Sequence, residues 1–468
     1  MTTVGMHRVR LSVMSGFMLA SGLLLASGAS PGLAAASSGG GTVGGFSFGE
    51  PQAQMVGASG CGTNTAGEPS LHVSKANLVG LGSEEGLGGG TEFWRGRQGG
   101  GTSAASPCGL TYSGQPNAVS GVGLSGGDID TAFAPVKSAA GSYRIYVASL
   151  NLGSVNVSTS TDNGATFSQT PVQAGLPLDD REWIAAYGAH TSLLSYHDIA
   201  TTNIDVLRSD NGGALYTQES RVIPDTDYKA NNNELGNLVI DHNHSTAGGF
   251  WAYQAFVAPS RAPDPTATSV TDNEAFLGVS NDGGATWTDK AIRCSTRFGG
   301  TGLAHNFPNV SVAPDGTLFY AVSNDQGIYV ARSADHGATW TCSGKISSTS
   351  RAIFPWIVAT SHGEDLVWYG AVGSGASQVW YVYFAQNIKS AVTGWSTKRL
   401  MPVHQGPVCE GGINCTGGRQ LFDDFALDTD RSGWAHIAYS HDAPDLGGSG
   451  TYTGYAVQRS GTRVGAPN

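Results

Sequence analysis

Apolar and polar residues alternate along most of this chain in short runs, which is the pattern of strands buried on one face. A run, a polar turn and a second run recur seven times, and each pair is followed by a third run such as SVNVSTS at 154–160. The seven pairs span 71–83, 129–150, 183–198, 238–256, 310–325, 356–372 and 425–442. Helix-forming residues are not enriched in any long window, so the pattern predicts an all-β fold.

Units of about 50 to 70 residues with three or four antiparallel strands are typical of propeller blades. A single blade cannot bury both of its faces, whereas blades arranged around an axis bury each other. We therefore predict a β-propeller of four-stranded antiparallel blades, with seven blades and six as the alternative. A strand from residues 44–56 is expected to complete the last blade, and 258–274 reads as an insertion in the fourth.

A second repeated feature is the pattern Ser-x-Asp-x-Gly-x-Thr-aromatic, called here the Ser-x-Asp turn. Three copies are complete, namely STDNGATF at 160–167, SNDGGATW at 280–287 and SADHGATW at 333–340; a fourth, at 208–216, keeps Asp210 and Gly212 but lacks the Thr. The Asp side chain can accept backbone N–H groups, and the Gly permits a positive φ. We therefore interpret the four Asp residues as structural.

The first 36 residues resemble an export signal. A basic start with His7, Arg8 and Arg10 precedes the apolar run 11–26, and Ala34 to Ala36 offer a small-residue cleavage site. We expect a secreted protein cleaved near Ala36; an uncleaved membrane anchor is the alternative. Residues 37–67 form a Gly- and Ser-rich leader, and 68–468 form the propeller.

Charge and cysteine content narrow the possible partners. The chain has 25 basic and 36 acidic residues, and residues 1–36 contain no acid, so the mature chain is more acidic still. Such a surface argues against nucleic acid. Six Cys in an exported chain favour disulfides, and the local pairing is Cys61–Cys108, Cys294–Cys342 and Cys409–Cys415. Zinc is the alternative; no metal, cofactor or membrane partner is predicted after signal removal, and we expect a monomer.

In a propeller, the residues before each inner strand and after each second strand meet at one mouth of the channel. In this sequence those positions are rich in carboxylates, histidines and arginines, although only 13% of all residues are charged. Candidates include Asp130, Arg181, Glu182, Glu234, Arg351, Arg419, Asp424, His197 and His441. Such convergence of ionisable groups predicts a functional site, with capping of loops as the structural alternative.

The Ser-x-Asp turns resemble the Asp-box, or bacterial neuraminidase repeat, of the sialidase superfamily. The resemblance implies a secreted propeller and a glycoside hydrolase acting on terminal glycan residues, of the exo-α-sialidase type, with a glycan or glycoconjugate as partner. It also implies three arginines that bind the sugar carboxylate, matched here by Arg181, Arg351 and Arg419. Bidentate guanidinium groups suit that ligand.

The same resemblance implies a Tyr nucleophile beside a Glu, and an Asp acid/base. Tyr439 or Tyr381 would be the nucleophile, Glu182 or Glu234 its partner, and Asp130 or Asp424 the acid. His197 and His441 are placed among the substrate-binding residues. The chain lacks the Phe/Tyr-Arg-Ile-Pro motif of sialidases, which have six blades. A neutral-glycan hydrolase using Asp130 and Asp424, and a non-catalytic propeller that binds a glycan or a protein, are therefore alternatives.

Overall fold

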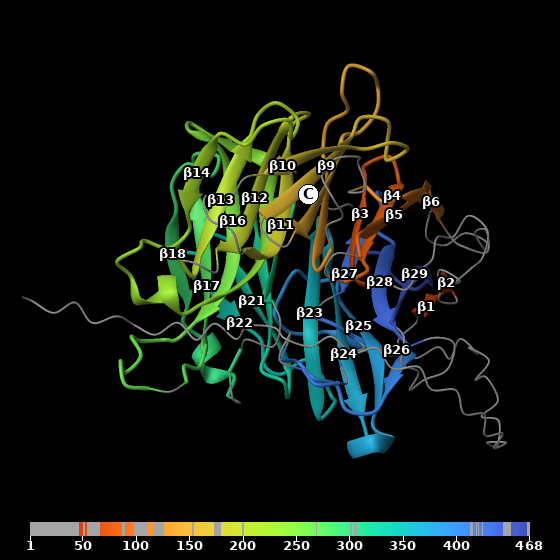
Figure 1. Ribbon diagram of the computed structural model, residues 1–468. Helices are drawn as coiled ribbons and strands as arrows, with labels where there is room; N and C mark the ends of the chain where they lie inside the picture. The colour runs from red at the N-terminus through yellow and green to blue at the C-terminus, as the bar shows by residue number, and fades with distance from the viewer. Residues whose placement is uncertain are drawn as a thin grey trace, which may run out of the picture. The chain divides into compact units, whose positions relative to one another are not determined.

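The computed structural model describes most of the chain after residue 45. The described ranges are 46–49, 52–53, 66–86, 89–97, 110–116, 126–151, 154–172, 179–198, 201–267, 269–299, 302–303, 307–411, 415–417, 419, 421–423, 425–442 and 451–465. They contain seven antiparallel sheets that follow one another in chain order, as the colour sequence of Figure 1 shows. The predicted seven-bladed propeller is therefore confirmed.

Six sheets consist of four consecutive strands each. They are β3 (Gly67–Val73), β4 (Leu78–Glu84), β5 (Thr91–Arg97) and β6 (Thr111–Gly114); β7 (Ile129–Phe133), β8 (Ile145–Asn151), β9 (Ser154–Ser160) and β10 (Ser168–Val172); β11 (Asp179–Tyr187), β12 (Thr191–Asp198), β13 (Asn203–Ser209) and β14 (Gln218–Arg221); β15 (Glu234–Thr246), β16 (Gly249–Ala258), β17 (Glu274–Ser280) and β18 (Thr288–Ile292); β19 (Asn309–Val312), β20 (Leu318–Ser323), β21 (Ile328–Ser333) and β22 (Thr341–Cys342); β23 (Arg351–Thr360), β24 (Gly363–Val372), β25 (Val379–Asn387) and β26 (Ser396–Gln405). Three short 3₁₀ helices lie in connections, η1 (Tyr228–Asn231), η2 (Ser295–Arg297) and η3 (Gly375–Ser377).

The seventh sheet joins the two ends of the described chain. It contains β27 (Ala426–Thr429), β28 (Ala435–His441) and β29 (Tyr452–Ser460), and its outer edge is β1 (Ser47–Phe48) with β2 (Gln52–Ala53). Both short strands pair antiparallel with β29, and Figure 1 shows them beside it. The expected contribution of residues 44–56 to the last blade is confirmed, and the predicted insertion 258–274 is the connection between β16 and β17.

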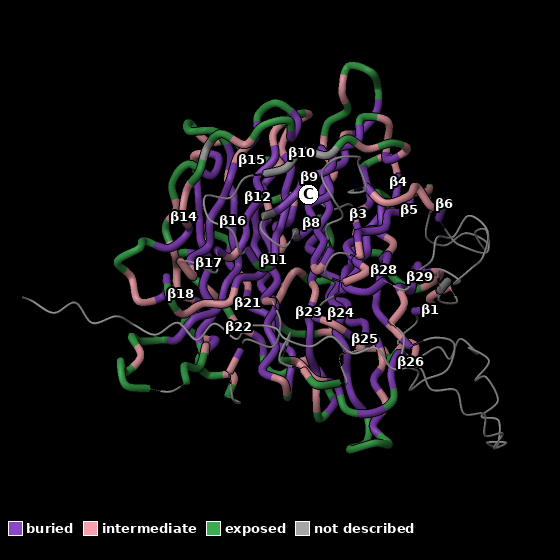
Figure 2. Tube along the Cα trace, viewed as in Figure 1, coloured by how far each residue is buried: buried purple, intermediate pink, exposed green. Residues whose placement is uncertain are grey.

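The blades pack face to face through apolar side chains. Each seam between blades contains a cluster of fully buried residues, and exposed residues gather in the connections (Figure 2). Along the axis, the inner strands enclose a cavity of about 190 Å³, lined by residues such as Ile184, Val310 and Leu427. The alternation of apolar and polar residues thus reflects the radial packing of strands.

Polar side chains of the inner strands bind the next blade. Asn237 Oδ1 accepts the N–H of Val310 at 2.7 Å and Asn237 Nδ2 donates to its carbonyl at 2.9 Å. The same kind of bond, from a backbone N–H to a side-chain oxygen of the neighbouring inner strand, occurs at four further seams. These bonds are Thr131 to Ser70 (3.0 Å), Ile184 to Asp130 (2.8 Å), Ile357 to Asn309 (2.8 Å) and Val73 to Asp428 (2.7 Å). We call these five bonds the axial ring.

The Ser-x-Asp turns close the hairpins between third and fourth strands. Asp282 Oδ1 accepts the N–H groups of Ala285 and Thr286, and its Oδ2 accepts the Thr286 hydroxyl. In the incomplete copy, Asn211 performs this role by accepting the Leu215 N–H at 3.0 Å. Our assignment of Asp210 to the turn was therefore wrong by one residue, since Asp210 instead binds Arg208.

Two disulfides are present, Cys294–Cys342 and Cys409–Cys415, as predicted, so these four thiols are not available for zinc. The pair Cys61–Cys108 lies outside the described residues, as do the export signal and most of the leader. Disulfides are typical of exported proteins. Within the described ranges, no helix has the length and apolar character needed to cross a membrane.

The axial ring can be tested with Asn237→Ala. This change removes both bonds of a buried side chain and leaves the Val310 N–H and carbonyl without partners. We expect the free energy of unfolding to fall by about 1–3 kcal/mol, measured by denaturant titration. Asn281→Ala, at an exposed turn position, is the control and should be near neutral. An equal loss in both variants would contradict the role of the ring.

A buried carboxyl group near the start of β24 predicts a pH dependence of stability. Burial raises the pKa of Asp365 to about 8, against about 3.9 in an unfolded chain. The folded protein therefore binds this proton more tightly, and stability falls as pH rises from about 4 to about 8. Asp365→Asn should be more stable than wild type at pH 8.5 and lose less stability between pH 5 and pH 8.5, measured by thermal unfolding. The exposed Glu219→Gln should keep the wild-type slope.

Candidate functional site

Ionisable side chains converge where the inner strands begin. We call this group the mouth cluster. Its described members are Glu68, Glu84, Asp128, Asp180, Glu182, Glu234, Asp423, Arg181 and Arg419, and they interact electrostatically across several blades. Two members sit on β-bulges, since the register shifts near Glu68 and Arg181, which have φ of 47° and 43°. Bulges of this kind re-aim side chains at a strand end.

Two of the three predicted arginines meet at one carboxylate. Arg181 is 2% exposed, and its Nη1 lies 3.4 Å from Asp128 Oδ1 and 3.7 Å from Glu68 Oε2. Arg419 Nη2 lies 3.4 Å from the other oxygen of Glu68 and also binds Asp423. Glu68 thus links guanidinium groups from β11 and from the segment before β27.

The third arginine has separate partners. Arg351 Nε and Nη2 bind Asp325 Oδ1 at 2.8 and 2.6 Å, and Nη2 also contacts Glu410. Glu410 follows Cys409, so the disulfide to Cys415 closes the short loop that carries this carboxylate. The guanidinium of Arg351 is therefore engaged in ion pairs with Asp325 and Glu410, which are not members of the mouth cluster.

Aromatic rings lie beneath the guanidinium groups. The Arg181 guanidinium carbon is 4.1 Å from the Trp183 ring centre and 4.7 Å from that of Phe307. Trp183 also packs against Trp356, at 5.7 Å between centroids, and Trp356 lines the axial cavity. Arg419 lies 5.2 Å from the ring of Phe422. These rings, called here the aromatic layer, lie against both guanidinium groups, and Trp356 connects them to the lining of the axial cavity.

Several carboxyl groups of the mouth cluster have raised pKa values, which favour their protonated form. Burial raises the pKa of Glu234 to about 8, and repulsion from Asp180 and Asp423 adds to the shift. Burial likewise raises the pKa of Glu84 to about 8, partly offset by the Gly86 N–H. The pKa of Glu182 is raised by burial and by the charge of Asp128. A protonated carboxyl group at neutral pH can act as a general acid.

Asp423 differs from these acids because Arg419 binds it directly. The pKa of Asp423 is raised by burial, and the Arg419 guanidinium offsets this shift only in part. Asp423 also raises the pKa of Glu234, so the two groups lie within electrostatic range. The half-buried Glu234 is therefore near Asp423, which Arg419 binds.

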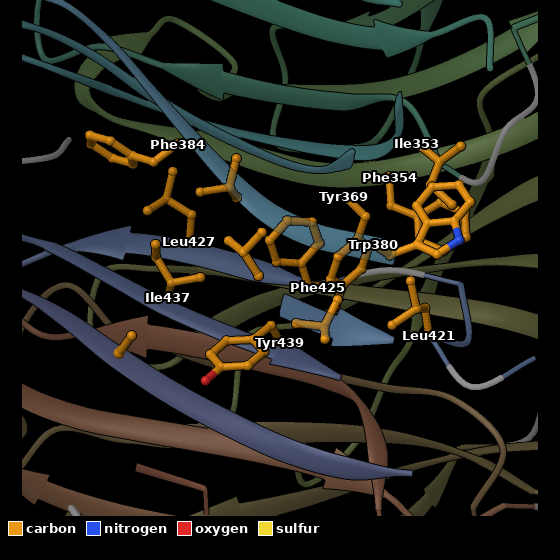
Figure 3. Close-up of a cluster of buried hydrophobic side chains, with 14 of the residues drawn as sticks. Ile353, Phe354, Tyr369, Trp380, Phe384, Leu421, Phe425, Leu427, Ile437 and Tyr439 are labelled. Atoms are coloured by element: carbon orange, nitrogen blue, oxygen red, sulfur yellow. The ribbon is translucent and has the colours of Figure 1, made fainter. Parts of the chain in front are cut away.

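The remaining predicted site residues lie elsewhere or have other partners. Asp130 belongs to the axial ring and also accepts the Ser70 hydroxyl. Tyr439 lies in a buried apolar cluster with Tyr369, Phe425 and Ile437, as Figure 3 shows. Asp424 lies outside the described residues.

The two histidines end second strands, and Tyr381 lies on a third strand. His197 Nε2 bonds to the Thr202 carbonyl at 3.0 Å, which holds the turn after β12. His441 Nδ1 contacts the Asp442 carbonyl at 2.9 Å. The Tyr381 ring faces Arg399 on the outer strand β26, at 4.6 Å. These contacts give each of the three side chains a structural partner. Within the described ranges, no group of three or more His, Cys, Asp and Glu is spaced to hold a metal ion.

The sequence interpretation missed Glu68 and the aromatic layer. Glu68 stands at the start of the first inner strand, where Arg181 stands in the third. Extending the first repeat upstream by four residues would have found it. Phe307 and Phe422 share a positive φ of 52° before their inner strands, and this conformation has no signal in the sequence.

No protein-family model matches the sequence, and no curated protein matches it. Among solved structures, an α-L-arabinofuranosidase from Fusarium graminearum is 10% identical with a TM-score of 0.46, covering 65% of this chain and 88% of that chain. A xyloglucanase from Xanthomonas campestris is 13% identical (TM-score 0.46; 87% and 55%), and a sialidase from Streptococcus pneumoniae is 11% identical (TM-score 0.40; 87% and 70%). The structural neighbours thus include sialidases and other glycoside hydrolase propellers, at a level that carries no information on substrate or mechanism.

The roles of two arginines can be separated by stability. Arg181→Met removes the cation that pairs with the buried Asp128 and leaves Glu68 with Arg419 alone, so we expect a loss of about 3–5 kcal/mol in the free energy of unfolding. Arg351, whose side chain is 30% exposed, should lose about 0–1 kcal/mol on the same change. Denaturant titration of both variants measures the difference. Similar losses would show that Arg181 does not hold the mouth cluster together.

Proposed function

We propose that this protein is a secreted glycoside hydrolase whose mouth cluster cleaves glycosidic bonds by carboxyl chemistry. Glu234 would be the general acid that protonates the leaving-group oxygen. Asp423 would stabilise the positive charge that develops on the sugar ring, and water would then attack the anomeric carbon and give a proton back to the Glu234 carboxylate. The observation that carries the proposal is the half-buried Glu234, with a pKa of about 8, within electrostatic range of the arginine-bound Asp423.

The same residues support a mechanism without a tyrosine nucleophile. Glu234 has no hydrogen bond or ion pair to its carboxyl group from any described residue, and it is partly exposed. A substrate oxygen could therefore approach it directly. Tyr439 is 1% exposed within apolar neighbours, so an attack on a sugar from this side chain would need the seam between two blades to open.

The exo-sialidase form of the proposal places a sugar carboxylate on Arg181, Arg351 and Arg419. In its favour, Arg181 and Arg419 already converge on the Glu68 carboxylate. Against it, Arg351 is bound by Asp325 and Glu410, and an anionic sugar would enter a cluster rich in carboxylates. We therefore propose neutral or cationic glycans as substrates ahead of sialosides.

Turnover of fluorogenic glycosides tests the proposal. A panel should include neutral hexosides and pentosides, amino-sugar glycosides and a sialoside. On any cleaved substrate, Glu234→Gln and Asp423→Asn should each lower kcat/KM by about 10²–10⁴-fold, because each removes one carboxyl function. Asp365→Asn, on β24 and outside the cluster, is the control and should keep wild-type kcat/KM.

Other results would overturn the proposal. Wild-type kcat/KM in Glu234→Gln would exclude Glu234 as the acid. Retained glycan binding with no turnover across the panel would favour the non-catalytic propeller. The exo-sialidase alternative would be supported if Arg181→Ala and Arg419→Ala lost activity on a sialoside and kept it on neutral substrates.

A further inference from the structure

The axial cavity is a concave site separate from the mouth cluster. The mouth cluster gathers where the inner strands begin, whereas the cavity is lined by later residues of the same strands, such as His72 of β3, Ala186 of β11 and Ala359 of β23. Lys75, in the turn after β3, lines the cavity and is exposed. The cavity therefore reaches solvent on the face opposite the mouth cluster.

The walls of the cavity are mainly apolar. The lining includes Ile184, Val239, Val310, Val358 and Leu427. A dry cavity of about 150 Å³ is large enough for benzene, so the volume of about 190 Å³ in this protein suits one six-membered ring with a small substituent. A sugar ring fits these walls poorly, because its several hydroxyl groups would be buried without hydrogen-bond partners.

Aromatic side chains line both ends of the cavity. Trp356 lies at the end nearest the mouth cluster, where its ring centroid is 5.7 Å from that of Trp183. Phe133 and Tyr143 belong to the opposite end, since they flank the connection between β7 and β8. Because aromatic rings pack favourably edge to face and offset face to face, this lining favours an aromatic ligand.

His72 brings an available hydrogen-bonding atom to the cavity. Its side chain is 36% exposed, and its Nδ1 lies 3.6 Å from Asp428 Oδ2. Within the described ranges, Asp428 is the only partner of the ring, so Nε2 remains available. The oxygens of Asn237 and Asp428, by contrast, accept backbone N–H groups in the axial ring. A hydroxyl group suits Nε2 in either protonation state, because a hydroxyl both donates and accepts.

Charged side chains of both signs line the cavity, which favours an uncharged ligand. An anion would approach the carboxyl groups of Asp130 and Asp428, and a cation would approach Lys75. Burial lowers the pKa of His72, but Asp428 and Asp130 raise it by more, so the ring adds positive charge. His242, the other histidine of the lining, already contacts the Ala186 carbonyl through Nε2 at 2.9 Å.

We propose that the axial cavity binds a small uncharged aromatic alcohol of the phenol type, with its ring against the apolar walls and its hydroxyl group on His72 Nε2. The proposal concerns a second site and does not depend on the proposed hydrolase activity. It rests on the size of the cavity, its apolar and aromatic lining, and the position of His72 beside Asp428.

The test is a ligand-observed NMR titration of the full protein at pH 7 with phenol, toluene, benzoate and benzylamine. Phenol and toluene have nearly the same shape, and the other two carry opposite charges. Phenol should bind at least about tenfold more tightly than benzoate or protonated benzylamine, because burying an ion without a matched partner is costly. Tightest binding of either charged ligand would overturn the proposal. So would the absence of binding across the series, since the cavity would then hold water alone.

His72→Phe tests the hydrogen bond while it keeps an aromatic ring at this position. The variant should bind phenol about tenfold more weakly and toluene within about twofold of wild type, because one hydrogen bond is lost. Glycoside turnover should not change, since His72 is not part of the mouth cluster. An equal change for phenol and toluene would show that the hydroxyl group does not bind His72.

Val358→Phe tests the location by filling the cavity, and it should abolish binding of both phenol and toluene. The matched control is Val372→Phe on the same strand pair, where the valine is 42% exposed and binding should stay at the wild-type level. Thermal unfolding confirms that each variant folds, and Ala185→Val, also in the lining, replaces Val358→Phe if that variant does not fold. Wild-type phenol binding in the folded cavity variant would place the ligand elsewhere and overturn the proposal.

Discussion

The bonds of the axial ring fix where the inner strands lie, and the rest of the molecule follows from that. A blade cannot bury both of its faces alone, so its stability comes from the seams with its neighbours. At five seams, a side-chain oxygen on one inner strand accepts a backbone N–H of the next, as Asn237 does for Val310. Because β1 and β2 pair with β29, the last blade receives its outer strands from the opposite end of the described chain.

The axial ring also decides which polar residues remain for chemistry. Asp130 gives both of its oxygens to the ring and to Ser70, so its carboxylate is engaged in structure. One step further toward the strand ends, the bulges at Glu68 and Arg181 interrupt the ladder and turn side chains toward the mouth. In the first four blades, the axial ring and the mouth cluster are therefore only two or three residues apart along the inner strand, as Glu68 and Ser70 are.

This narrow separation explains what the sequence could and could not predict. Alternating polarity and the Ser-x-Asp turns predicted seven blades, because local patterns specify strands and hairpins. They could not tell Asp210 from Asn211, since both side chains can accept the same N–H groups. Glu68 was missed because the bulge that carries it depends on the neighbouring blade. The burial of Tyr439 in a seam was not predicted, because the position of a residue in a strand does not by itself reveal which face of the sheet it occupies.

Raised carboxyl pKa values alone do not mark the site. Asp365 has a pKa of about 8, as Glu234 does, yet its described polar contact is Gln386 of the same blade. The mouth cluster differs because its acids come from several blades and raise one another's pKa values. Mutual repulsion of this kind costs folding free energy, which is reasonable at a functional site and has no evident purpose in a structural ring.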